Sequence, residues 1–267
     1  MPEQDSASGS KAPLDDRPAV YEWEFAIQYH ETDQYGFVRH TALLNFMQTA
    51  SVEHAKLLGV SVNAMLKAGY TWVLSRVHLT ITCYLRAGDT VRIRTWPALR
   101  THRFTVRDFE IYDGAGTLIG TATTSWAVLD MATRRPALLG SVLPDFPLTP
   151  ARALQDDFGT LPQLKNRERE QTIPVLRSDL DSNRHVNNTV YVSWALEAIP
   201  DEIDRDFRLT SLEIGFKAEA LYGDVIRTMA TASAESSSCF IHLIENAADG
   251  RELARLRTCW EPKLYGY

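Results

Sequence analysis

The stretch that decides the fold is SDLDSNRHVNNTVYVSWALEA, residues 178–198, because it repeats an earlier stretch, HETDQYGFVRHTALLNFMQTA, residues 30–50. The two align at an offset of 148 residues (181 − 33), which places Asp33 on Asp181 and Val38 on Val186. Downstream, residues 77–95 align with residues 212–230 at an offset of 135 (223 − 88), and Trp126 falls on Trp260. Because the matches keep their order and the offsets drift by only a few residues per loop, the chain contains two copies of one unit.

Each copy has the same predicted order of elements: a short strand, one helix, then alternating antiparallel strands. The helices follow from apolar spacing in residues 44–58, ended by Gly59, and in residues 191–198, ended by Pro200. Residues 77–85 and 212–220 alternate like strands, and turns are predicted at residues 113–116 and 248–250. Four prolines between residues 140 and 170 indicate a linker. The pattern predicts an α+β pseudo-dimer.

Composition excludes several classes of protein. The 267 residues carry a net charge of −6, which argues against a nucleic-acid binder. No apolar run approaches the roughly 20 residues that span a bilayer. The acidic N-terminus has no apolar core, so it predicts a disordered arm rather than a targeting peptide. Three cysteines without a pairing pattern predict buried thiols in a reducing cytoplasm; they are Cys83, Cys239 and Cys259.

The motifs resemble those of the acyl-acyl-carrier-protein (acyl-ACP) thioesterase family. The resemblance is strongest in LDSNRHVNN with YVSW (180–194), TALLNFMQTASVEHA (41–55), and WVLSR through GDTVRIRTW (72–96). It implies an α+β tandem double hotdog, in which each unit is a curved antiparallel sheet wrapped around one long helix. The expected domains are a disordered arm (1–18), an N-terminal hotdog unit with the acyl-chain pocket (19–140), a linker (141–170) and a catalytic C-terminal hotdog unit (171–262).

The same resemblance implies four catalytic residues in the second unit: Asp181, Asn183, His185 and Glu219. Plant members usually place a cysteine after this glutamate, but here Ala220 follows it, so no cysteine nucleophile is available there. Thioester hydrolysis needs an activated water or a nucleophile, and donors for the developing oxyanion. Asp181 would act as base or nucleophile, with Glu219 as partner base. Asn183 would orient the carboxylate, and His185 would contact the substrate or assist the leaving thiolate.

A plainer interpretation is that these polar residues only cap the helix. Capping uses one or two such side chains, and Asn187 or Asn188 would suffice. The spacing of the other three suits an extended segment whose alternate side chains share one side. Glu219 could be an ordinary exposed residue of a central strand. However, the first copy has uncharged residues at the matching positions, which predicts one active site per chain; these are Tyr35, Phe37 and Tyr84.

The first unit is expected to supply the acyl-chain pocket, and its helix offers four apolar residues that would line it, namely Leu44, Phe46, Met47 and Ala50. Each of these could instead simply fill the core. Asp33 could be a second base, although neither asparagine nor histidine accompanies it. An acidic carrier protein would need a basic rim, for which the candidates are Arg184, Arg100, Arg103, Arg107, Arg134 and Arg135.

The sequence contains no GxSxG elbow, no Cys/His cluster with metal spacing and no glycine-rich phosphate loop. No metal and no cofactor are therefore expected. The predicted reaction is hydrolysis of fatty acyl-ACP to free fatty acid and holo-carrier protein, which terminates fatty acid synthesis. The alternatives are an acyl-CoA thioesterase on the same fold, a hotdog dehydratase and a non-catalytic acyl-binding module. The sequence does not predict the preferred acyl chain length, nor does it decide whether the protein forms a homodimer.

Overall fold

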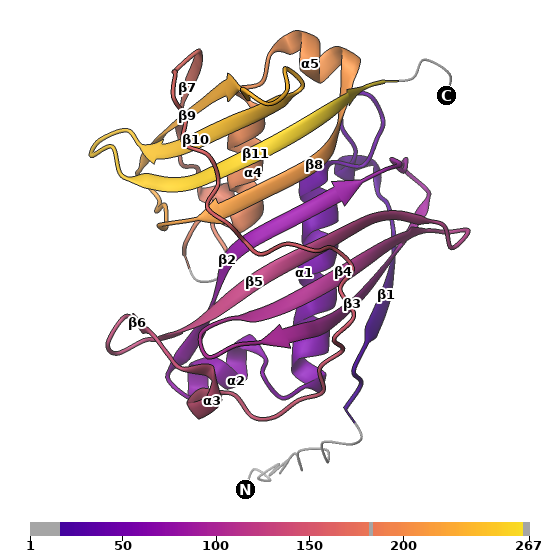
Figure 1. The fold of residues 1–267 in the computed structure, drawn as a ribbon, viewed down its shortest axis with the longest axis vertical. Coiled ribbons are helices and arrows are strands. Elements are labelled where there is room, and N and C mark those ends of the chain that lie inside the picture. The colour runs from indigo at the N-terminus through magenta and orange to yellow at the C-terminus, as the bar shows by residue number, and fades with distance from the viewer. Residues whose placement is uncertain (1–16, 182–183, 264–267) are drawn as a thin grey trace, which may run out of the picture.

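The computed structural model describes residues 17–181 and 184–263. The predicted arm therefore lies outside the described residues apart from Arg17 and Pro18, and Asn183 lies outside them as well. Within the described part, one antiparallel sheet has eleven strands, with the path β1-β3-β4-β5-β2-β8-β11-β10-β9-β7 and β6 paired to β5 (Figure 1). The strands are β1 (Tyr21–Ala26), β2 (Tyr70–Ile81), β3 (Thr90–Arg100), β4 (Thr105–Asp113), β5 (Leu118–Asp130), β6 (Arg135–Pro136), β7 (Arg169–Pro174), β8 (Phe207–Phe216), β9 (Val225–Ala232), β10 (Cys239–Asn246) and β11 (Glu252–Pro262).

The two copies meet at the middle of this sheet, where β2 pairs antiparallel with β8. Arg76 lies opposite Gly215, and Leu79 lies opposite Leu212. The order of strands in the first unit, β1-β3-β4-β5-β2, is mirrored by β8-β11-β10-β9-β7 in the second. This arrangement confirms the repeat that the sequence predicts. The predicted turns at residues 113–116 and 248–250 are the β4–β5 and β10–β11 hairpins.

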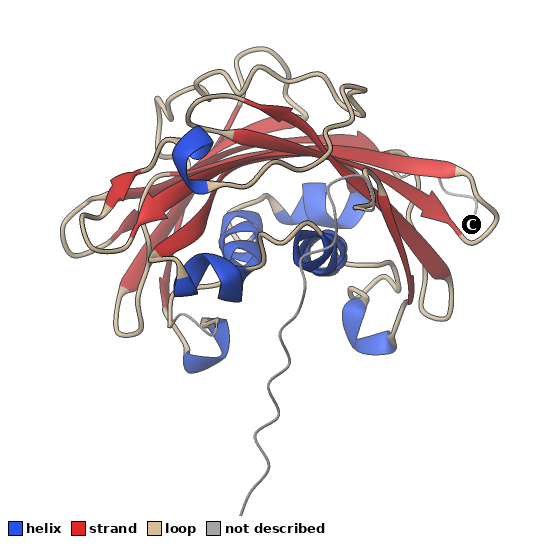
Figure 2. Cartoon of the chain, turned by 90° about the horizontal axis from the view of Figure 1, so that it is seen from below, coloured by secondary structure: helices blue, strands red, loops and turns tan. Residues whose placement is uncertain are grey.

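One helix from each unit packs against the concave side of the sheet (Figure 2). They are α1 (His40–Leu57) and α4 (Asn188–Leu196); shorter helices are α2 (Val62–Lys67), α3 (Leu139–Val142) and α5 (Asp201–Asp206). The apolar faces of α1 and α4 are buried, which removes their side chains from water and stabilises the unit. The predicted stops hold: Gly59 follows α1 with a φ of +76°, and Pro200 separates α4 from α5.

The linker crosses the convex side and contacts strands of both units. Asp108 of β4 is fully buried and accepts hydrogen bonds from Arg152 Nε and Ala153 N, each 2.8 Å long. Arg76 of β2 donates to the Phe158 carbonyl at 3.0 Å, and Arg255 of β11 donates to the Leu161 carbonyl at 3.0 Å. The linker is therefore hydrogen-bonded to both halves of the sheet.

The prediction of three buried, unpaired cysteines is wrong. Cys239 and Cys259 form a disulfide across β10 and β11, where they lie directly opposite each other with Cα atoms 4.1 Å apart. Cys83 is exposed, because it follows the end of β2. The pairing was invisible in the sequence because it depends on the register of two antiparallel strands. In the described part of the chain, no helix is long and apolar enough to cross a membrane.

Candidate active site

The predicted catalytic loop is a tight turn rather than the extended segment that the residue spacing suggested. Arg184 N donates to the Asp181 carbonyl at 3.0 Å, and Asp181 N donates to the His185 carbonyl at 2.8 Å. The Asp181 side chain stabilises the turn, since its Oδ1 accepts from His185 N at 3.3 Å. Short polar side chains commonly bond nearby backbone in this way, which explains why the chain folds back here.

The first unit contains the same turn with different side chains. Asp33 Oδ1 accepts from Tyr35 N at 2.8 Å and from Phe37 N at 3.0 Å. Gly36, with a φ of +81°, occupies the place of Arg184, whose φ is +65°. The helix-cap interpretation is correct for Asn187, whose side chain accepts from Thr189 N at 3.1 Å, whereas Asp181 holds the preceding turn as Asp33 does. In the described residues, both loops therefore share the same backbone hydrogen bonds and carry different side chains.

The second loop brings His185 next to Glu219. Val186 N donates to the Ala220 carbonyl at 3.2 Å, and His185 pairs with Leu221 in an isolated bridge. As a result, His185 Nε2 lies 3.5 Å from Glu219 Oε2, with the two side chains 36% and 48% exposed. The expectation that Glu219 lies on a central strand is wrong, because β8 ends at Phe216 and Glu219 belongs to the connection that follows.

Tyr191 of α4 supports this connection, and sequence reasoning assigned it only to the helix core. Its buried hydroxyl accepts a hydrogen bond from Ala220 N at 2.8 Å. Burial, together with the nearby charge of Glu219, raises the pKa of Tyr191 to about 12. A tyrosine on an apolar helix face is the signal that could have revealed this contact, because a buried hydroxyl needs a partner.

In the first unit, the side chains at the positions that correspond to His185 and Glu219 form structural contacts. Tyr84, the counterpart of Glu219, bonds to His40 Nε2 at 2.7 Å and to the Leu209 carbonyl. Burial lowers the pKa of His40 to about 4 and raises the pKa of Tyr84. The Arg86 guanidinium lies over the Phe37 ring, 4.3 Å from its centroid. These contacts fill the space that His185 and Glu219 occupy in the second unit.

The arginines expected to form a basic rim divide into two groups. Arg107 faces the interior, where it contacts His54 Nδ1 at 3.1 Å, and burial lowers its pKa to about 10. Arg100 holds carbonyls of the segment around α3. Both assignments to the rim were wrong, because strand alternation did not show which face is covered. The exposed members are Arg103, Arg134, Arg135 and Arg184.

Arg134 reaches the candidate site from the first unit. It lies in the turn between β5 and β6 of the first unit, and its Nη2 is 3.7 Å from Glu219 Oε2. The sequence indicated Arg134 only as a candidate for the basic rim. Nothing in the repeat pattern relates a turn of the first unit to a loop of the second.

A small apolar cavity of about 40 Å³, partly open to solvent, lies beneath the sheet between α1 and α4. Leu44 and Met47 line it from the first unit, whereas Val192 lines it from the second. Asn188 and Thr189, which directly follow the catalytic loop, also contribute to its wall. Two other predicted lining residues lie in the core instead: Phe46 stacks on Phe25 at 4.6 Å, and Ala50 is fully buried.

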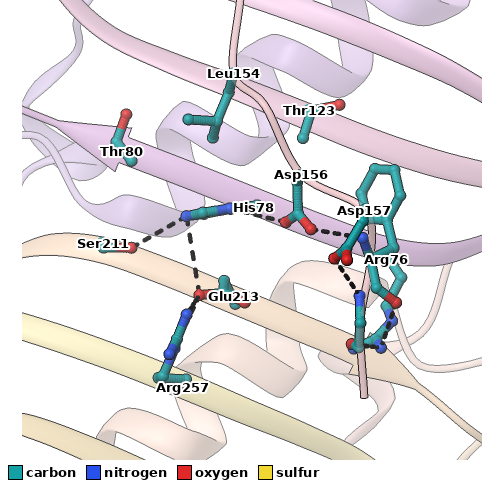
Figure 3. A network of polar contacts seen from close by, with 12 residues as sticks. Arg76, His78, Thr80, Thr123, Leu154, Asp156, Asp157, Ser211, Glu213 and Arg257 are labelled. Atoms are coloured by element: carbon teal, nitrogen blue, oxygen red, sulfur yellow. Dashed lines mark hydrogen bonds and ion pairs between the residues drawn. The ribbon is translucent and has the colours of Figure 1, made fainter. Parts of the chain in front are cut away.

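A second polar cluster joins the linker to both units on the convex side (Figure 3). His78 Nδ1 bonds to Asp156 Oδ2 at 2.8 Å, and its Nε2 is 4.0 Å from Glu213 Oε1. One ligand atom from each of His78, Asp156 and Glu213 lies within 4.8 Å of the other two, but the two carboxylates contact opposite ring nitrogens, and a metal ion binds only one of these nitrogens. Arg257 already contacts Glu213. The cluster fits a hydrogen-bonded clamp better than a metal site.

The same cluster has the residue types of a serine hydrolase, since His78 Nε2 is 3.3 Å from Ser211 Oγ. A nucleophile also requires donors for the oxyanion, usually backbone amides at a loop or a helix start. Ser211 lies inside β8, which is paired on one side with β2 and on the other with β11. Glu213 would add negative charge next to the reacting atoms. The geometry therefore favours the clamp over a second active site.

Comparison with known proteins gives one consistent result. Residues 18–146 match the acyl-ACP thioesterase N-terminal domain, and residues 163–262 match the C-terminal domain of the same family. The chain is 28% identical to oleoyl-acyl carrier protein thioesterase 1 of Arabidopsis thaliana, covering 91% of this chain and 76% of that protein. It is 30% identical to dodecanoyl-[acyl-carrier-protein] hydrolase of Umbellularia californica, covering 92% and 68%.

Solved structures show the same fold. A 12:0-ACP thioesterase from Umbellularia californica superposes with a TM-score of 0.79 at 28% identity, covering 92% of this chain and 98% of that chain. An acyl-ACP thioesterase from Bacteroides thetaiotaomicron superposes with a TM-score of 0.83 at 24% identity, covering 91% and 98%. These similarities confirm the double hotdog architecture that the resemblance implied.

Proposed function

The chain belongs to the acyl-ACP thioesterase family, whose members are thioester hydrolases, and on that premise we propose that it cleaves fatty acyl-ACP to free fatty acid and holo-carrier protein. In this role it terminates fatty acid synthesis. The observation that carries the proposal is the pairing of His185 with Glu219, 3.5 Å apart. Asn188, three residues after His185, lines the apolar pocket between the units. An acyl chain in that pocket would bring its thioester carbonyl close to the pair.

The proposed chemistry follows from this arrangement. Glu219 accepts a proton from a water held beside His185, and the water oxygen attacks the carbonyl carbon. The start of α4, capped by the Asn187 side chain, lies near the developing oxyanion and favours its negative charge. The carbon–sulfur bond then breaks, and the proton passes through His185 to the leaving thiolate. Asp181 holds the turn that carries His185, and its carboxylate acts with Glu219 as a base for the water. Asn183 is proposed to orient the two carboxylates.

A covalent route through Asp181 is the rival mechanism. In that route the carboxylate attacks the carbonyl carbon and forms an anhydride, which water then hydrolyses. A single turnover in oxygen-18 water tests the covalent route. Label in the Asp181 carboxylate would contradict direct attack by water, whereas label confined to the fatty acid product excludes an anhydride that water opens at the Asp181 carbonyl.

The substrate is tested by measuring thiol release from matched acyl chains, eight to eighteen carbons long, on ACP and on coenzyme A. We expect higher kcat/KM for the ACP thioesters. Preference for the coenzyme A thioesters would assign an acyl-CoA thioesterase instead. Conversion of 3-hydroxyacyl thioesters without thiol release would indicate a dehydratase, and chain binding without turnover an acyl-binding module. The cytoplasmic location and a homodimer stay predictions.

A further inference from the structure

The β5–β6 turn of the first unit is a rigid structure that ends next to the site of the second unit. Asp130 Oδ1 accepts from Ala132 N at 3.0 Å and from Thr133 N at 2.8 Å. Arg134 N closes the turn by donating to the Asp130 carbonyl at 2.8 Å. Tyr70, at the start of β2, pairs with Asp130. Because β2 also pairs antiparallel with β8, this turn and the end of β8 lie at the same end of the sheet.

The backbone at Arg134 is one that glycine normally adopts. Its φ is +57°, in the left-handed region that a side chain disfavours. The β10–β11 hairpin has the same turn: Gly250 N donates to the Asn246 carbonyl at 2.9 Å, and Gly250 has a φ of +70°. Glycine is thus the residue that this turn favours. An arginine at a strained position is a reason to look for a function of its side chain.

That side chain points to the candidate base. Arg134 Nη2 is 3.7 Å from Glu219 Oε2, the same oxygen that lies 3.5 Å from His185 Nε2. The Arg134 side chain is 70% exposed, so in the free enzyme water weakens this pair. The acyl-pantetheine part of a bound substrate, lying over the site, would exclude that water and strengthen the pair.

We propose that Arg134 is a positioning residue for the reaction: it holds the Glu219 carboxylate beside His185, so the first unit completes the active site of the second. This inference rests on the proposed thioesterase function. It differs from a role in carrier docking, because the group that Arg134 acts on is Glu219. The first unit then contributes to the chemistry as well as to the pocket.

The test compares three variants in the full chain with the thioester that the wild type cleaves best and with the corresponding acyl-pantetheine. The pantetheine ester lacks both the carrier protein and the phosphate, so carrier docking does not affect it. R134G removes the side chain and fits the backbone, R134Q removes only the charge, and R134K keeps the charge. R135Q is the matched control, because Arg135 is an exposed neighbour in the same turn. Melting temperature is measured for each variant.

We expect R134G and R134Q to lower kcat about tenfold on both substrates, with KM changed less than about twofold. R134K should restore the wild-type kcat, R135Q should not lower it, and R134G should melt within about 2 °C of wild type.

A wild-type kcat of R134G and R134Q on acyl-pantetheine would overturn the proposal, and a raised KM confined to the carrier thioester would assign Arg134 to docking. If R134G has a much lower melting temperature than the wild type, the comparison of kcat between R134Q and R134K decides, since both variants keep a long side chain at this position. An inactive wild type would contradict the proposed function itself, which is a different failure.

Discussion

Replacing Arg152 with methionine is expected to destabilise the fold by about 3 to 5 kcal/mol, because it leaves a buried carboxylate without its cation. Asp108 has 0% exposure, and the Arg152 side chain is 16% exposed. Arg152 Nε donates to Asp108 Oδ2 at 2.8 Å, and Nη2 donates to the Thr123 hydroxyl at 3.0 Å. Hydrogen bonds to charged groups contribute roughly 1.5 to 3 kcal/mol each, and the loss of these two gives a similar total.

The assay is thermal and urea unfolding followed by circular dichroism. The expected loss lowers the melting temperature by about 10 °C at this chain length. Lys56→Met is the control, because Lys56 pairs with Glu53 at 2.6 Å but is 54% exposed, and it should cost less than about 1 kcal/mol. Equal small losses in both variants would refute the conclusion that the linker is clamped to the sheet through Asp108.

Two further predictions concern pH and the pocket. Burial lowers the pKa of His54 and of His242 to about 4, below their ordinary 6.5, so stability present above pH 6.5 should be lost as pH falls toward 4, by on the order of 2 kcal/mol each at pH 5. Urea midpoints that stay flat from pH 7.5 to 5 would contradict this. Met47→Ala enlarges the pocket and should lengthen the preferred acyl chain by about two carbons. Each additional buried methylene should raise kcat/KM roughly fourfold. An unchanged chain-length profile would place the acyl chain elsewhere.

The repeat was the strongest signal in the sequence, and its structural basis is now visible. Val38 N donates to the Leu85 carbonyl at 2.8 Å, and Val186 N donates to the Ala220 carbonyl at 3.2 Å. These equivalent bonds justify the alignment of Tyr84 with Glu219, which sequence comparison alone suggested. Local patterns succeeded here because both copies use the same hydrogen bonds at the same positions.

Contacts between segments that are distant in the sequence were not predictable. The disulfide between Cys239 and Cys259 depends on strand register, and the contact between Arg134 and Glu219 depends on the pairing of β2 with β8. The roles of Arg100 and Arg107 depended on which face of the sheet is covered. Residue spacing also misjudged the catalytic loop, because an aspartate that bonds its own backbone turns a segment that alternation would leave extended.

The central claim is that the second unit carries the one reactive site, and a matched pair of variants tests it directly. Asp181→Asn and Asp33→Asn each keep a side-chain oxygen that can hold the equivalent turn, so both should fold. We expect thiol release from acyl-ACP to fall at least about a hundredfold in Asp181→Asn and to stay near wild type in Asp33→Asn. Equal loss in both variants, or full activity in Asp181→Asn, would contradict the account.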